Sequence, residues 1–173
     1  DELVAFLRKV TGDIEDLKVV KAAGYIAAEF KQAGTGAKQK KWFGASQQSD
    51  GTLRIAGILT ALLQNPAPSV ICVEEPELTI HAGVIEILMD HLVERSMTRQ
   101  VFITTHSPVV LDSFPHADPA HGIFGVQRID GITRAERISE EGLQPVRDSL
   151  LSLGDYVRYG NFQQDFLEQL GVS

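Results

Sequence analysis

The fold class follows from one short segment, SVICVEEPE, which occupies residues 69–77. Its first five residues are mostly β-branched and apolar, a composition typical of a β-strand that is buried on both faces. Cys72 lies within this run, so we expect a buried thiol. Glu74 and Glu75 follow at once, where a strand of a parallel sheet would end and where such sheets bind ligands. The segment therefore predicts a buried strand with acidic residues at a ligand-binding edge.

Helices and a second strand surround this segment in alternation. Apolar residues at helical spacing predict amphipathic helices over residues 53–64 and 83–95. A second apolar strand, QVFITT, occupies residues 100–105. The order strand, helix, strand indicates an α/β protein with a parallel sheet.

Peripheral elements flank this α/β core on both sides. On the N-terminal side we expect a helix at residues 2–10, a strand pair at 16–31 with a turn near Gly24, and a short strand at Trp42-Phe43. On the C-terminal side we expect a short helix after Pro108, a hairpin around Asp130-Gly131, and helices near 145–153 and 162–170.

The composition is that of a globular protein. The chain has 173 residues, 43% hydrophobic and 23% charged, which suits a single domain over residues 1–173. One cysteine excludes a disulfide framework. The formal net charge of −7 argues against a protein that binds mainly to the phosphate backbone of nucleic acids.

Membrane insertion and secretion are not indicated by the sequence. No apolar stretch approaches 18 residues and no N-terminal signal pattern is present, so we expect a cytoplasmic protein with no membrane partner. The chain begins at Asp1, and its only methionines are Met89 and Met97. We therefore expect it to be a piece of a longer protein.

The first candidate cluster is the Glu74-Glu75 pair. Adjacent carboxylates repel each other by about 1 kcal/mol in water and by more in a drier cleft. A Mg²⁺ ion that bridges substrate phosphates would relieve this repulsion through one carboxylate, and the second would then be free to orient or deprotonate a water molecule. The alternative is a solvated acidic turn.

Two further polar clusters also lie at the ends of predicted elements. Residues 104–108, TTHSP, end the second strand, and adjacent strands would place His106 beside Glu75, where its imidazole could donate to a phosphate oxygen. Residues 49–52, SDGT, precede the helix at 53–64, where backbone N–H groups can bind an anion. The alternatives are a loop histidine satisfied by the backbone and an ordinary helix cap.

Taken together, the segments SDGTLR, EEPE and TTHSP, in this order, resemble the C-terminal half of an ABC-class ATPase head of the RecF-like and SMC-like branch, related to the OLD-family nucleases. The resemblance covers residues 17–160, and SLGDY at residues 152–156 adds a weaker match. It implies a P-loop NTPase fold with a mainly parallel sheet, helices on both faces and peripheral antiparallel strands.

The resemblance also implies roles for residues and ligands, with ATP and Mg²⁺ as cofactors. Ser49, Asp50, Gly51 and Thr52 correspond to the signature motif, which contacts the γ-phosphate of a nucleotide held by the partner subunit. Glu74 would hold Mg²⁺ through water, Glu75 would polarise the attacking water, and His106 would contact the γ-phosphate. His81 lies in a loop that crosses the dimer interface, although the family's Leu-His-Pro reads Ile80-His81-Ala82 in this chain.

The phosphate-binding loop G-x-x-x-x-G-K-[ST] is absent from this sequence. The nearest candidate, GTGAK at residues 34–38, lacks the Gly-Lys-Ser/Thr ending and is interpreted as a turn. One hypothesis is an ATPase that acts as a head-to-head homodimer, with DNA or a partner nuclease bound through regions outside this chain. DNA repair and phage defence are plausible settings. The alternative is a non-catalytic dimerisation or regulatory module.

Other chemistries are less well supported by the sequence. Zinc binding by His81, Glu86 and His91 lacks an HExxH pattern, and a loop with His116 and His121 is typical of a solvated turn. A Toprim nuclease would need a later Asp-x-Asp pair, and a Ser107 hydrolase would need a G-x-S-x-G elbow. The basic run KQKKW at residues 38–42 could contact nucleic acid or form a solvated hairpin end.

Overall fold

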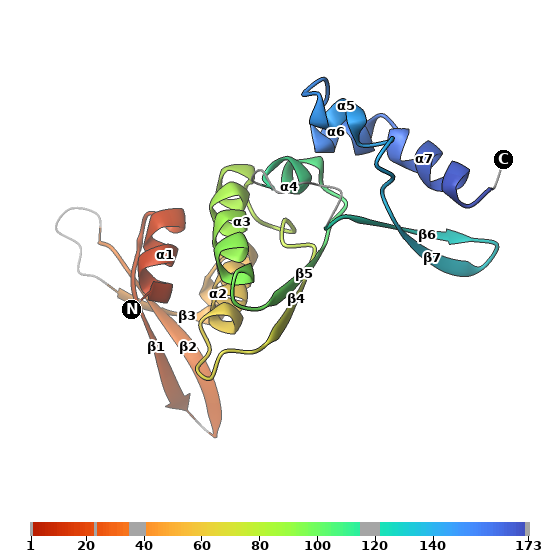
Figure 1. The fold of residues 1–173 in the computed structure, drawn as a ribbon. Coiled ribbons are helices and arrows are strands. Elements are labelled where there is room, and N and C mark those ends of the chain that lie inside the picture. Colours follow the sequence, from red (N-terminus) through yellow and green to blue (C-terminus); the bar gives the residue numbers. More distant parts are fainter. Residues whose placement is uncertain (1, 23, 35–40, 115–121, 172–173) are drawn as a thin grey trace. The chain divides into compact units, whose positions relative to one another are not determined.

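The computed structural model describes residues 2–22, 24–34, 41–114 and 122–171. They form two compact units, residues 1–104 and residues 105–173 (Figure 1). The prediction of a single domain over the whole chain stays a prediction. No helix within the described ranges is long and apolar enough to span a membrane.

The first unit begins with a helix packed on an antiparallel sheet. Helix α1 (Glu2–Thr11) contacts strand β1 (Ile14–Ala22), which pairs with β2 (Tyr25–Gln32), and β2 pairs with β3 (Lys41–Gly44). The apolar side chains between helix and sheet are buried: Val4, Phe6, Leu7, Ile14 and Phe30. These elements confirm the helix, strand pair and short strand predicted for this part of the sequence.

Helix α2 (Asp50–Leu62) follows a single 3₁₀ turn, η1 (Ala45–Gln47). Its apolar face buries Ile55, Leu59 and Leu62. The helix starts three residues earlier than its apolar pattern predicts, because Ser49 caps it by accepting a hydrogen bond from the backbone N–H of Thr52. Its first turn is therefore formed by the SDGT segment itself.

A parallel strand pair with a connecting helix completes the first unit. Strands β4 (Val70–Glu74) and β5 (Gln100–Thr104) are parallel, with Glu74 opposite Thr104. Helix α3 (Ala82–Ser96) joins them and buries Ile85, Leu88, Met89 and Leu92. The α/β class predicted from the strand–helix–strand order is thus confirmed (Figure 1).

The expectation that both faces of these strands are buried is wrong for the described residues. Burial alternates along β4: Ile71 and Val73 are buried, whereas Val70 and Cys72 are exposed. Neighbouring residues of a strand point to opposite faces, and only one face of this pair is covered. Phe102, which lies opposite Cys72 on β5, is 54% exposed for the same reason.

The second unit combines short helices with one hairpin. Helix α4 (Pro108–Asp112) precedes strands β6 (Phe124–Ile129) and β7 (Ile132–Arg137), which form the predicted antiparallel hairpin. Asp130 and Gly131 both have positive φ, 50° and 81°, as a tight two-residue hairpin turn requires. Helices α5 (Gln144–Arg147), α6 (Leu153–Arg158) and α7 (Asn161–Gln169) follow. The core of this unit is formed by Ile138, Leu143, Leu153 and Tyr156.

The single helix expected near residues 145–153 is two helices in the structure. Helix α5 ends at Arg147, and Ser149 has a φ of 57°, a left-handed conformation that interrupts a right-handed helix. Helix α6 then starts at Leu153, capped by Ser152. The predicted helix near residues 162–170 is confirmed as α7.

Some predicted features lie outside the described residues. These are most of the Gly34–Lys38 turn, the lysines at positions 38 and 40, and the loop with His116 and His121. Trp42, the last residue of the basic run, is described. Its ring lies 4.1 Å from the ammonium group of Lys18, a cation–π contact within the β1–β3 sheet.

Candidate functional site

The acidic pair lies where strand β4 ends. The strand stops at Glu74, and the backbone N–H of Glu75 still donates to the carbonyl of Thr104 on β5, at 2.8 Å. Glu75 has a φ of 43°, so the chain leaves the extended conformation there. Neighbouring residues of a strand point to opposite faces, so Glu74 and Glu75 could both act at one edge only if the strand ends there. The structure meets this condition, because β4 stops at Glu74.

Two overlapping turns continue from Glu75. The N–H of Leu78 donates to the carbonyl of Glu75, and the N–H of Ile80 donates to the carbonyl of Glu77, each at 3.1 Å. Thr79 has a φ of 64° in the second turn. A β-branched residue adopts this left-handed conformation at a cost of order 1–3 kcal/mol, which the surrounding structure must offset. The turn is therefore a strained segment next to the acidic pair.

Gly51 of the SDGT segment lies against this strained turn. A Cβ atom on Gly51 would come within 2.4 Å of the carbonyl oxygen of Thr79, far inside van der Waals contact. Gly51 is buried at the start of α2. Only glycine permits this approach between the start of α2 and the turn after β4. The SDGT cluster is thus in direct contact with the turn that follows the acidic pair.

Arg54 provides a second connection between the same two segments. Its Nη2 donates to the backbone carbonyls of Glu74 and Glu75, at 2.5 and 2.8 Å. Hydrogen bonds from a charged donor are stronger than neutral ones. Arg54 therefore fastens the first turns of α2 to the two residues predicted to bind Mg²⁺ and to polarise water.

The polar groups of the SDGT segment are available at the N-terminus of α2. The Ser49 hydroxyl accepts from the N–H of Thr52 at 3.1 Å and lies 2.8 Å from the Thr52 hydroxyl. Ser49 and Asp50 are exposed, and Thr52 is half-buried. A helix N-terminus carries a partial positive charge, which suits an anionic group.

His81 caps helix α3. Its Nδ1 accepts from the N–H of Gly83 at 3.2 Å, and the residue is exposed. The zinc alternative gains no support, because the described part of the chain holds no group of three or more His, Cys, Asp or Glu side chains placed to bind a metal. His91 packs its ring against that of Phe6, with centroids 4.6 Å apart.

His106 belongs to the second unit and is exposed. The Thr105 hydroxyl accepts from the N–H of Ser107 at 2.9 Å, which closes a turn around the histidine. Because strands β4 and β5 end level with each other, the chain leaves β5 beside Glu74. The position of the His106 side chain relative to Glu75 stays a prediction.

Comparison with known proteins identifies the family. Residues 4–112, more than half of the chain, match the family model described as "AAA domain, putative AbiEii toxin, Type IV TA system". The chain belongs to this AAA family. No curated protein sequence matches it. The matched range includes the SDGT, EEPE and THSP segments.

Solved structures similar to this AAA domain are heads of SMC ATPases. One, from work on ATP-driven dimerization and DNA-stimulated activation of SMC ATPases, has 15% identity and a TM-score of 0.56 over 86% of this chain and 88% of its own. The Smc head with an extended coiled coil bound to the C-terminal domain of ScpA, from Pyrococcus furiosus, has 17% identity and a TM-score of 0.58. The Smc head with a coiled coil and joint, from Pyrococcus yayanosii, has 18% identity and a TM-score of 0.58.

These similarities show the fold. The AAA domain has the mixed α/β fold of an SMC-type P-loop NTPase head, which confirms the resemblance inferred from the three sequence segments. In both Pyrococcus comparisons the aligned region covers 86% of this chain. It covers only 36% and 28% of the two Pyrococcus chains.

Arg54 contacts the candidate site of the AAA domain, and the sequence pattern assigns it no role. It belongs to the SDGTLR segment, and it is the only charged residue among residues 53–63, which are apolar apart from Arg54 and Thr60. A charge within a mainly apolar stretch of helix indicates a specific partner, because a charge that is partly buried must be paired or hydrogen-bonded. Its partners are two backbone carbonyls of another segment, and only the structure identifies them.

We expect Arg54→Ala to destabilise the first unit by about 2 kcal/mol, because two charge-assisted hydrogen bonds to the carbonyls of Glu74 and Glu75 are lost. Urea unfolding measured by tryptophan fluorescence would show this, since Trp42 is the only tryptophan and lies in this unit. Lys9→Ala, at an exposed position of α1, is the control and should change stability by less than about 0.5 kcal/mol. Equal effects of the two variants would contradict the clamping role of Arg54.

Proposed function

We propose that the protein containing this chain binds and hydrolyses ATP with Mg²⁺, as an ABC-class ATPase whose heads dimerise on the nucleotide. One observation carries the proposal: the SDGT and EEPE segments are joined in one compact unit by the Gly51–Thr79 contact and by Arg54. Segments about 20 residues apart in sequence have no need of such a connection if one is only a helix cap and the other only a solvated turn.

The acidic pair divides into two roles in this proposal. The Glu74 carboxylate, exposed at the end of β4, would hold Mg²⁺ through water, and the fit rests on the oxygen donors that Mg²⁺ prefers. The bound ion would neutralise charge on the phosphates. Glu75, half-buried and held by Arg54 and by β5 through its backbone, would orient the attacking water and accept its proton.

The remaining site residues would recognise the terminal phosphate and the partner head. Ser49 and Thr52, with the backbone N–H groups at the start of α2, would contact the γ-phosphate of a nucleotide held by the other subunit. His106 would donate to the same phosphate from the end of β5. His81, exposed at the start of α3, would lie at the interface between heads.

The proposal requires a phosphate-binding loop, which residues 1–173 do not contain. Each composite site would combine the loop of one subunit with the SDGT segment of the other. DNA, or a partner nuclease, would bind through other regions, and DNA repair or phage defence would be the setting. The SMC relative studied for ATP-driven dimerization and DNA-stimulated activation supports this class of mechanism through fold alone.

A second candidate is a non-catalytic dimerisation or regulatory module. The absence of the loop from residues 1–173 keeps this candidate open, since an ATPase without a cradle for the β- and γ-phosphates would bind nucleotide poorly. A G-x-x-x-x-G-K-[ST] segment elsewhere in the same protein would exclude this candidate, and its absence would exclude the ATPase proposal.

Mg-ATP should convert the protein from monomer to dimer, and a charge placed at Ser49 should prevent this. Asp and Asn both cap helices, so Ser49→Asp and Ser49→Asn should both preserve α2. The aspartate would repel the γ-phosphate by a kcal/mol or more, which corresponds to about a tenfold weaker ATP-dependent dimer than in the asparagine variant. Light scattering after gel filtration, with and without Mg-ATP, measures the difference. Equal dimerisation of the two variants would contradict a γ-phosphate contact at Ser49.

A further inference from the structure

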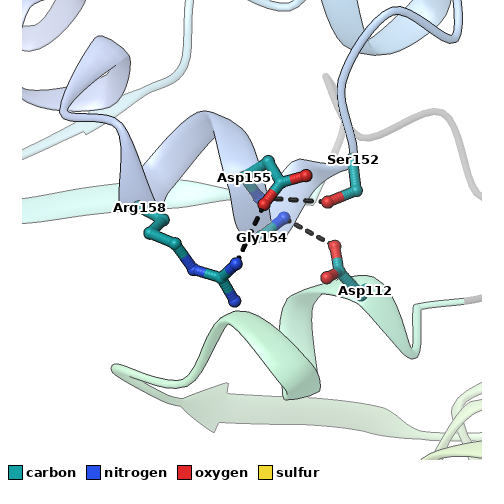
Figure 2. A network of polar contacts seen from close by, with 5 residues as sticks. All are labelled: Asp112, Ser152, Gly154, Asp155 and Arg158. Carbon is teal, nitrogen blue, oxygen red and sulfur yellow. Dashed lines mark hydrogen bonds and ion pairs between the residues drawn. The ribbon is translucent and has the colours of Figure 1, made fainter.

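The SLGDY segment, residues 152–156, forms the start of α6 and packs against α4 within the second unit (Figure 2). The Ser152 hydroxyl accepts from the N–H of Asp155 at 3.0 Å and caps the helix. Asp155 also accepts from Arg158 at 3.2 Å, within α6. The carboxylate of Asp112, the last residue of α4, accepts from the N–H of Gly154 at 2.7 Å. The two short helices are therefore joined by a hydrogen bond from backbone to carboxylate.

Gly154 lies too close to α4 to carry a side chain. A Cβ atom there would be 2.5 Å from the carbonyl oxygen of Pro108 and 2.6 and 2.7 Å from the two carboxylate oxygens of Asp112. Contact with both ends of α4 fixes the helix along its length. Leu111 of α4 also packs on the core cluster that contains Leu153 and Tyr156.

Helix α4 begins two residues after His106, so its position fixes the end of the histidine turn. Ser107 donates its N–H to Thr105 Oγ1, and its carbonyl accepts from the N–H of Leu111 at 3.3 Å. Pro108, the residue against Gly154, follows directly. Only Ser107 separates His106 from Pro108, whose carbonyl oxygen lies against Gly154. Ser107 is hydrogen-bonded through both its N–H and its carbonyl.

We propose that Gly154 and Asp112 are positioning residues that hold the His106 turn in place through α4. This inference rests on the proposed function, because it concerns the histidine assigned to the γ-phosphate. Asp112 is the last residue matched by the family model, and Gly154 lies beyond it. The C-terminal segment would thereby contribute to the nucleotide site through a residue outside the matched range.

The test uses the full-length protein and four variants. Gly154→Ala inserts the clashing Cβ, and Asp112→Ala removes the acceptor. Asp112→Asn keeps an oxygen that can accept from Gly154. Gly122→Ala is the matched control, since a Cβ at Gly122, in the same unit, would meet nothing within 4 Å.

Two readouts distinguish positioning from stability alone. Steady-state kinetics should show kcat for Mg-ATP about tenfold lower in Gly154→Ala and Asp112→Ala, with KM changed by less than about twofold. NMR of labelled histidine should show a displaced ring signal of His106, assigned with His106→Gln. Asp112→Asn and Gly122→Ala should give wild-type values in both measurements.

Failure of the positioning role can be distinguished from failure of the proposed function. If the wild-type protein does not hydrolyse ATP, the proposed function fails, and the His106 ring signal alone decides the positioning role. If Gly154→Ala and Asp112→Ala lower the melting temperature but leave the ring signal and kcat at wild-type values, the positioning role is overturned. It is also overturned if Asp112→Asn behaves as Asp112→Ala does.

Discussion

Glu75→Gln should reduce ATP turnover by about a hundredfold or more in the full-length protein, the usual range for loss of a general base. The substitution keeps the size and shape of the side chain and removes its ability to accept a proton. Glu75 makes its described backbone contacts through its N–H and carbonyl, to Thr104, Arg54 and Leu78. Those contacts are unaffected by the change, so the fold should be retained.

ATP-dependent dimerisation should survive in the same variant. The contacts assigned to nucleotide binding come from Ser49, Thr52, Glu74 and His106, none of which is altered. Hydrolysis would normally separate the heads, so the dimer formed with Mg-ATP should persist longer than in the wild-type protein. Phosphate release and light scattering measured on the same samples give both quantities.

Glu86→Gln is the matched control for this experiment. Glu86 is an exposed carboxylate on α3 in the same unit, and its replacement changes the net charge by the same amount. Turnover in this control should equal that of the wild-type protein. Unchanged turnover in Glu75→Gln would remove Glu75 from the catalytic role.

The order and type of most elements could be predicted because their signals are local. The apolar spacing of α3, the apolar run of β4 and the Asp130-Gly131 turn each depend on neighbouring residues only. Burial could not be predicted in the same way. An apolar run such as residues 70–73 has the same composition with one face covered as with two, and the exposure of Cys72 depends on what packs against the sheet.

The site was predictable to a different extent. Residue types at the ends of elements marked the SDGT and EEPE segments as candidates, although a helix cap such as Ser49 also explains polar residues at the start of α2. Their contact was not predictable, because it depends on the left-handed conformation of Thr79 and on the reach of Arg54. No local pattern marks Thr79, a residue type that rarely adopts positive φ.

These contacts couple the start of α2 to the turn after β4, so we expect the two segments to move together. A phosphate bound at the N-terminus of α2 would act on Thr79 through Gly51 and on the acidic pair through Arg54. The same contacts would carry a displacement of the acidic pair back to the phosphate site. Substitutions at the contact should therefore affect stability and turnover together.

Gly51→Ala should destabilise the first unit by about 1–3 kcal/mol, the range for an overpacked buried site. The added Cβ would lie 2.4 Å from the Thr79 carbonyl oxygen. Both groups belong to the backbone or are fixed to it, so no side-chain rotation relieves the clash. Either α2 or the strained turn must move, and turnover by the full-length protein should fall with it.

Gly57→Ala, in the same helix, is expected to stabilise the first unit rather than destabilise it. A Cβ at Gly57 would meet nothing within 4 Å, and alanine in a helix interior is favoured over glycine by about 0.5–1 kcal/mol. Urea unfolding followed by Trp42 fluorescence compares the two variants on one scale. A Gly51→Ala protein that is as stable and as active as Gly57→Ala would show that α2 and the turn after β4 do not meet in solution, and the case for a joined site would be lost.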